Sequence, residues 1–129
     1  MNWIMNWIFN IMGLIHRVKV RVHKAYLKAN NVPCYFVNIT NMSPKRDAEV
    51  THVWFECGGR VNVINPMRPL PKRLRPEESW ETWIEVDKLP GSLGDTVYTS
   101  ARVRLSNGRN LKSQLNKNVP SEGYIPGAT

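Results

Sequence analysis

The stretch from Pro33 to Cys57 restricts the fold of this chain more than any other part of the sequence. Tyr35, Val37 and Ile39 recur at every second position, and the run T-N-M-S-P-K-R-D separates them from a second alternating run. A period of two is typical of a half-buried β-strand, and clusters of Asn, Ser, Pro and Asp mark turns. The stretch therefore predicts two strands joined by a short loop.

The second run predicts a strand with two different faces. One face carries Thr51, Val53, Phe55 and Cys57, and the other carries Val50, His52, Trp54 and Glu56. We expect Val53 and Phe55 to lie in the core beside the first strand. His52 and Trp54 would then lie on an outer face that another segment covers, and we expect the apolar N-terminal segment to dock there.

Two further runs alternate in the same way. The first places Val18, Val20 and Val22 on the inner face and Arg17, Lys19, Arg21 and His23 on the outer face. The second places Trp80, Thr82, Ile84 and Val86 on one face and Glu81, Trp83, Glu85 and Asp87 on the other. Both runs predict amphipathic strands, the first with a basic and the second with an acidic outer face.

Turn residues define the rest of the chain. The run N-P-M-R-P-L-P-K-R-L-R-P has four prolines, which exclude a central strand and predict an extended crossover between sheets. Strands are expected from Val97 to Leu105 and from Leu111 to Leu115, joined through Asn107-Gly108 as a hairpin.

About seven short strands without a second helical pattern predict an all-β fold, a two-sheet antiparallel sandwich. We assign residues 1–15 to an N-terminal helix, residues 16–117 to the sandwich and residues 118–129 to an irregular tail.

The N-terminal segment from Met1 to Ile15 contains no charged residue. Asn2, Asn6 and Asn10 are spaced four apart, as on one stripe of a helix that is otherwise apolar. Such a helix is about 22 Å long, shorter than the roughly 30 Å hydrocarbon core, so it suits the membrane interface better than a full span. The residues expected to contact a membrane or a partner are Trp3, Ile4, Trp7, Ile8, Ile11, Arg17, Lys19 and Arg21.

The distribution of charge supports a membrane contact but leaves a second interpretation open. Residues 1–46 contain seven basic residues and no acidic one, and basic side chains are attracted to anionic lipid. The alternative is that the helix packs against the sandwich or against a second copy of the chain. The natural start at Met1, Met5 or Met12 also remains open.

Two segments of the chain resemble the immunoglobulin-like modules that are common in bacterial proteins. They are V-N-I-T-N-M-S before V-T-H-V-W-F, and L-R-P-E-E-S-W-E-T-W-I-E-V, which is similar to the L-x-P-G-E-S turn and following strand of such modules. The resemblance covers about residues 17 to 115, extends to small uncharacterised bacterial proteins, and implies an immunoglobulin-like sandwich without an activity. The chain departs from true immunoglobulin domains because the run from Val97 to Leu105 has no cysteine for the sheet-bridging disulfide.

Catalytic and metal chemistry find little support. The histidines and cysteines lack the spacings of zinc sites, and there is no G-x-S-x-G motif, so we expect no enzyme activity, no metal and no cofactor. Cys34 and Cys57 are too few for a disulfide scaffold, which favours a cytoplasmic protein, peripheral to the inner face of a membrane.

The leading expectation is a non-enzymatic interaction or structural module whose partner is an anionic membrane surface, an unknown protein or a second copy. The alternative is a nucleic-acid-binding protein, in which phosphates are contacted by the basic crossover and a later strand. The residues of that predicted site are Arg68, Lys72, Arg73, Arg75, Arg102 and Arg104. Against this alternative, six of the ten acidic residues follow directly, between Glu77 and Asp95.

Overall fold

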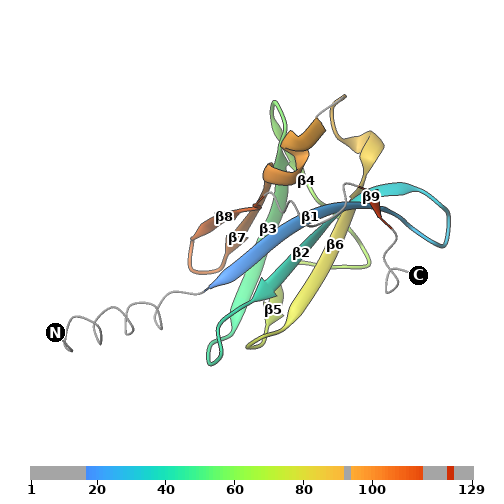
Figure 1. Cartoon of the computed structure of the whole chain (residues 1–129). Coiled ribbons are helices and arrows are strands. Elements are labelled where there is room, and N and C mark those ends of the chain that lie inside the picture. The colour runs from blue at the N-terminus through green and yellow to red at the C-terminus, as the bar shows by residue number, and fades with distance from the viewer. Residues whose placement is uncertain (1–16, 92–93, 115–121, 124–129) are drawn as a thin grey trace.

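The computed structural model describes residues 17–91, 94–114 and 122–123, so the predicted helix over residues 1–15 lies outside the described residues. The described part forms two sheets that face one another (Figure 1). The first sheet has the strand order β6-β2-β1-β9, formed by β1 (Val18–Tyr26), β2 (Pro33–Asn41), β6 (Ser79–Glu85) and β9 (Glu122–Gly123). The second has the order β4-β3-β7-β8, formed by β3 (Ala48–Glu56), β4 (Arg60–Asn62), β7 (Ala101–Leu105) and β8 (Asn110–Lys112), with β5 (Lys72–Leu74) also paired to β3.

The prediction of an all-β fold with two antiparallel sheets is confirmed, apart from a short parallel pairing of β9 with β1. The described residues contain nine strands rather than about seven. The two additional strands, β5 and β9, are three and two residues long, which is too short to leave an alternating pattern in the sequence. One of them, β9, belongs to the tail that we expected to be irregular.

The first hairpin follows the predicted alternation. β1 and β2 pair from Val18 opposite Asn41 to Tyr26 opposite Pro33, without interruption. Val20 and Val22 are buried, and Lys19 and Arg21, which alternate with them, are exposed. The turn between the strands contains Asn31 with a φ of 57°, a left-handed conformation that asparagine tolerates better than most residues.

The strand β3 contains an irregularity that the sequence pattern did not predict. Its register with β7 shifts between Val50 and His52, so the alternation of faces changes at Thr51. Val53 and Phe55 are buried as predicted, but Val50 is also fully buried in the core. The predicted outer position of Val50 was therefore wrong, because the bulge places it on the inner face.

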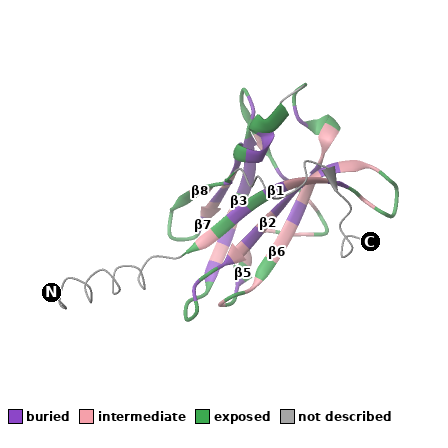
Figure 2. Cartoon of the chain, viewed as in Figure 1, coloured by how far each residue is buried: buried purple, intermediate pink, exposed green. Residues whose placement is uncertain are grey.

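The core lies between the two sheets, and Figure 2 shows buried positions along the facing strands. Val37 and Ile39 come from the first sheet, and Phe55 and Val103 from the second. The Tyr35 ring of β2 packs against Phe55 at a centroid distance of 6.4 Å. The sheets therefore share one hydrophobic core, as expected for a sandwich.

Several predicted segments differ in their boundaries, and one is the strand expected from Leu111 to Leu115, which is found as β8 over Asn110–Lys112. The run expected as a strand from Val97 begins instead as the 3-10 helix η2 (Gly94–Thr99), and β7 starts at Ala101. The hydroxyls of Thr99 and Ser100 donate hydrogen bonds to the carbonyl of Thr96. These bonds favour a helical turn at this position instead of an extended strand.

The proline-rich run contains the short strand β5, which pairs only with the start of β3. The chain crosses to the first sheet after β5, between Arg75 and Glu78, and β6 follows. The 3-10 helix η1 (Val86–Lys88) ends β6, so Val86 lies beyond the strand in which we had placed it. The prolines thus confine the strand to a sheet edge, in agreement with the exclusion of a central strand.

Candidate functional site

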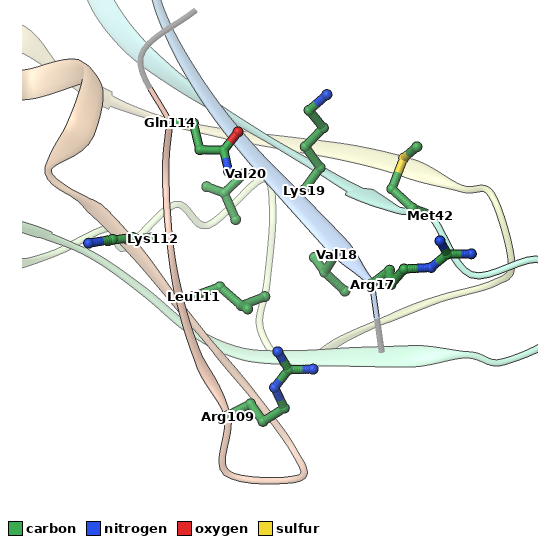
Figure 3. Close-up of a pocket in the computed structure, with 9 residues that line it drawn as sticks. All are labelled: Arg17, Val18, Lys19, Val20, Met42, Arg109, Leu111, Lys112 and Gln114. Atoms are coloured by element: carbon green, nitrogen blue, oxygen red, sulfur yellow. The ribbon is translucent and has the colours of Figure 1, made fainter. Parts of the chain in front are cut away.

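A basic groove opens between β1 of the first sheet and β8, an edge strand of the second sheet, with a volume of about 400 Å³. It is lined by Arg17, Val18, Lys19, Val20, Met42, Arg109, Leu111, Lys112 and Gln114. Figure 3 shows Val18 of β1 and Leu111 of β8 facing one another, with the guanidinium of Arg109 near both. We call this feature the basic groove.

The strand alternation explains the mixed lining of the basic groove. On β1, Val18 and Val20 turn toward the core while Lys19 points outward, and on β8 Leu111 turns inward while Lys112 is exposed. The backbone N–H of Gln114 donates to the Val20 carbonyl at 3.4 Å, which links the two sheets beside the groove. The apolar floor and the basic rim are therefore the two faces of the same strands.

The charge of the basic groove has one sign. Arg17, Lys19, Arg109 and Lys112 are all exposed, and no described residue of the lining is Asp or Glu. Met42 adds an apolar side chain that is 49% exposed. This combination can attract an anionic surface and also accept some apolar contact.

The predicted contact residues fall only in part on this groove. Arg17 and Lys19 line it, and Arg21 lies farther along the same exposed row of β1. Trp3, Ile4, Trp7, Ile8 and Ile11 lie outside the described residues, so their role stays a prediction. Sequence reasoning missed Arg109 and Lys112, although the Asn-Gly hairpin signal identified the turn that carries Arg109.

Trp54, in the surface where we expected the N-terminal segment to dock, is covered by two arginine side chains. Trp54 is only 4% exposed, because the guanidinium carbons of Arg60 and Arg104 lie 4.1 Å and 5.7 Å from the centre of its ring. Its indole N–H donates to the Glu56 carboxylate at 2.7 Å. His52 is exposed and bonds to Thr51 next to it. Docking of the N-terminal segment here stays a prediction.

The six residues of the predicted phosphate site are distributed over both sheets. Arg68 stacks on Trp83 of β6 at 4.9 Å and donates to the Glu81 carbonyl. Lys72 and Arg73 lie on β5 and approach Glu78 and Asp47 at 3.6 Å and 3.8 Å.

The other three members of that predicted site lie elsewhere. Arg75 is exposed in the turn after β5, whereas Arg102 and Arg104 lie on β7, which pairs with the opposite edge of β3. Arg102 and Arg104 instead share a face with Arg60, which sequence reasoning missed because Arg60 stands alone after Gly58-Gly59.

The described residues hold no group of three His, Cys, Asp or Glu side chains that could bind a metal ion. Cys34 and Cys57 are both buried and free, and burial with the nearby carboxylates of Glu85 and Asp87 raises the pKa of the Cys34 thiol to about 11. A thiol with so high a pKa is a poor nucleophile at neutral pH.

Within the parts of the chain that the structure describes, no helix has the length and apolar character needed to cross a membrane. Comparison with models of known protein families, with curated proteins and with solved structures gave no match.

Proposed function

We propose that this protein is a non-enzymatic interaction module that attaches to an anionic membrane surface through its N-terminal segment and the basic groove. The observation that carries the proposal is the basic groove itself, whose first residue, Arg17, is separated from the uncharged N-terminal segment only by His16. In this proposal, the partner of the interaction module is a protein or a second copy of the chain, and it would bind to a part of the sandwich outside the basic groove.

Physical estimates support the attachment. A Lys or Arg side chain close to an anionic leaflet contributes about 1 kcal/mol, so four such side chains add to the partitioning of an apolar segment. A single weak anchor gives only marginal and reversible binding, whereas an apolar anchor combined with a basic patch gives stable binding. Arg17 and Lys19 are the basic residues of the groove that are nearest to the N-terminal segment in the chain.

We further infer that the fold is immunoglobulin-like in its strand connections. The order β1-β2-β6 corresponds to strands A, B and E, and the order β4-β3-β7-β8 to strands C′, C, F and G of such domains. This correspondence supports the sequence resemblance but adds no activity, since many functions share the same sandwich.

Flotation with lipid vesicles tests the membrane proposal. The full chain should float with anionic vesicles and stay behind with neutral ones, and a chain that starts at Met12 should lose most of this binding. The substitutions Arg17→Gln and Lys19→Gln together should weaken binding about 30-fold, because they remove two basic side chains.

The matched control is the pair Lys28→Gln and Lys88→Gln, which removes the same charge. Lys28 follows the far end of β1 and Lys88 follows β6 at that same end, about 30 Å along the strands from Arg17. This control should change binding by no more than about twofold. If the full chain stays in solution as an oligomer, the N-terminal segment is a protein interface and the proposal fails.

A further inference from the structure

The outer face of the second sheet holds two guanidinium groups in fixed positions around a buried tryptophan. Trp54 lies at the centre on β3, Arg60 reaches it from β4, and Arg104 reaches it from β7. Arg102 is directly opposite Trp54 in the pairing of β3 with β7, and Lys112 is opposite Arg102 on β8. We call this feature the arginine face.

Asparagine side chains orient both guanidinium groups. The Nε of Arg60 donates to Oδ1 of Asn62 at 3.0 Å, and the Nε of Arg104 donates to Oδ1 of Asn110 at 2.9 Å. A guanidinium has five N–H donors, so each arginine keeps its four terminal donors for a ligand. Stacking on Trp54 and the bond to asparagine together fix the direction in which these donors point.

The arginine face carries more positive than negative charge, because Glu56, directly opposite Arg60 in the pairing of β3 with β4, is outnumbered by Arg60, Arg102, Arg104 and Lys112. No described carboxylate forms an ion pair with Arg60, Arg102, Arg104 or Lys112, whereas Lys72 and Arg73 on β5 each have one. The nearby carboxylate of Glu56 accepts the hydrogen bond of the Trp54 indole. Two oriented guanidinium groups without a carboxylate partner form an arrangement suited to an external anion.

We propose that the arginine face binds the phosphate backbone of a nucleic acid, without reading its bases. The planar donor fork of arginine matches phosphate oxygens, and the face extends over four strands, about 14 Å from β4 to β8, which is room for several phosphates. Trp54 lies beneath the guanidinium groups and is only 4% exposed, so it cannot stack on a base. Sequence-independent binding follows.

The same observations disfavour a membrane as the ligand of this face. A membrane contact needs exposed apolar side chains, and the apolar ring at the centre of the arginine face is covered. The arginine face shares Lys112 with the basic groove, but the inference rests on Arg60 and Arg104, which do not line that groove.

Fluorescence anisotropy with a labelled single-stranded DNA of about 20 nucleotides tests the inference on the full chain, between about 50 mM and 200 mM salt. The pair Arg60→Gln and Arg104→Gln should raise the Kd about tenfold to a hundredfold and should lower the salt slope by about 1.4. The pair Arg73→Gln and Arg75→Gln, which removes the same charge from β5 and from the turn after it, should change the Kd by no more than about twofold.

A second pair, Asn62→Ala and Asn110→Ala, keeps the net charge and both contacts with Trp54. This asparagine pair should weaken DNA binding, because the guanidinium groups lose the hydrogen bonds that orient them. If the arginine variant does not fold, the asparagine pair still tests whether oriented guanidinium groups bind DNA. Equal losses from the two arginine pairs would show binding by net charge alone and would overturn the inference. Absence of DNA binding by the full chain at low salt would overturn the inference too. It would also be overturned if the Arg60→Gln and Arg104→Gln pair lost vesicle flotation but kept DNA binding.

Discussion

Cys34 lies in a second apolar cluster, on the outer face of the first sheet. Ala25, Cys34 and Phe36 are fully buried there, with Trp83 packed against them. Cys34 is directly opposite Ala25 on one neighbouring strand and Glu85 on the other. This position explains why burial, followed by the carboxylates of Glu85 and Asp87, raises the pKa of the thiol to about 11.

A Cys57→Ala variant, which leaves Cys34 as the only thiol, should therefore react very slowly with Ellman's reagent while folded. At pH 8 the thiolate fraction of Cys34 is about a hundredfold smaller than that of an ordinary cysteine, and burial hinders the reagent further. The absorbance of the released thiolate measures the rate. One thiol should react fully in denaturant, and rapid reaction in the native protein would contradict the burial of Cys34.

Single residues show where sequence reasoning reached its limit. The alternation in β3 placed Trp54 on the outer face, and this is confirmed, but the pattern could not identify its cover. Arg60 comes from another strand after a glycine turn, and Arg104 from a strand far along the chain. Contacts between distant residues depend on strand register, which local periodicity does not encode.

Asn41, the last residue of β2, connects several elements. Its amide Nδ2 lies 2.8 Å from the Arg46 carbonyl, 3.2 Å from that of Leu74 and 3.1 Å from that of Arg75. Its Oδ1 accepts from the Ser43 backbone N–H at 3.1 Å. The side chain is fully buried, and it ties the loop between β2 and β3 to the end of β5.

Asn41→Ala should lower the free energy of unfolding by about 2 kcal/mol, because it removes the amide donor from the buried Leu74 carbonyl and from two partly buried carbonyls. Urea titration followed by tryptophan fluorescence measures the change. Lys45→Ala, an exposed substitution in the same loop, should stay within about 0.5 kcal/mol of the wild type. Equal effects of the two substitutions would mean that the amide contacts do not stabilise the fold.

Whole strands were predictable where inward and outward side chains alternate over many residues. β1, β2 and β6 follow their alternating patterns, and the Asn-Gly turn joins β7 to β8 as expected. The bulge in β3 adds one residue without any signal in composition, so Val50 was misplaced. The start of β7 was misplaced because Val97 and Tyr98 are apolar enough for a strand, yet they are buried in a 3-10 helix.

At the scale of the molecule, the fold redistributes charge in a way that a count along the chain cannot reveal. The count placed the positive excess in residues 1–46, but the basic groove also takes Arg109 and Lys112 from the other end of the sandwich sequence. The crossover arginines, which form a cluster in the sequence, are separated because Arg68 stacks on the first sheet and Arg73 pairs with Asp47. Tertiary pairing therefore determines which cations act together.

The stability of the whole domain should depend on pH through His23, whose ring stacks on Phe36 of the neighbouring strand at 5.6 Å. Its Nε2 has no hydrogen-bond partner among the described residues, and burial lowers the pKa of His23. Glu81 Oε2 is 3.7 Å from that nitrogen, but burial also raises the pKa of Glu81 despite Asn38 and Arg68, so burial disfavours the charged form of both side chains. We therefore do not regard this contact as a stabilising ion pair.

The sign of the effect follows from the lowered pKa of His23 in the folded state. Its contribution to stability is fully present above the ordinary histidine pKa of about 6.5 and is lost as the pH falls through the lower folded value. The raised pKa of Glu81 acts in the opposite direction, since its contribution is present below its ordinary value and is lost as the pH rises. A His23→Phe variant keeps an aromatic ring beside Phe36 and removes the titratable group at this position. Between about pH 7 and pH 5, the wild type should therefore lose more stability than the variant in urea titrations. Parallel pH profiles of the two proteins would show that His23 becomes charged without cost and that its ring is not buried as the structure describes.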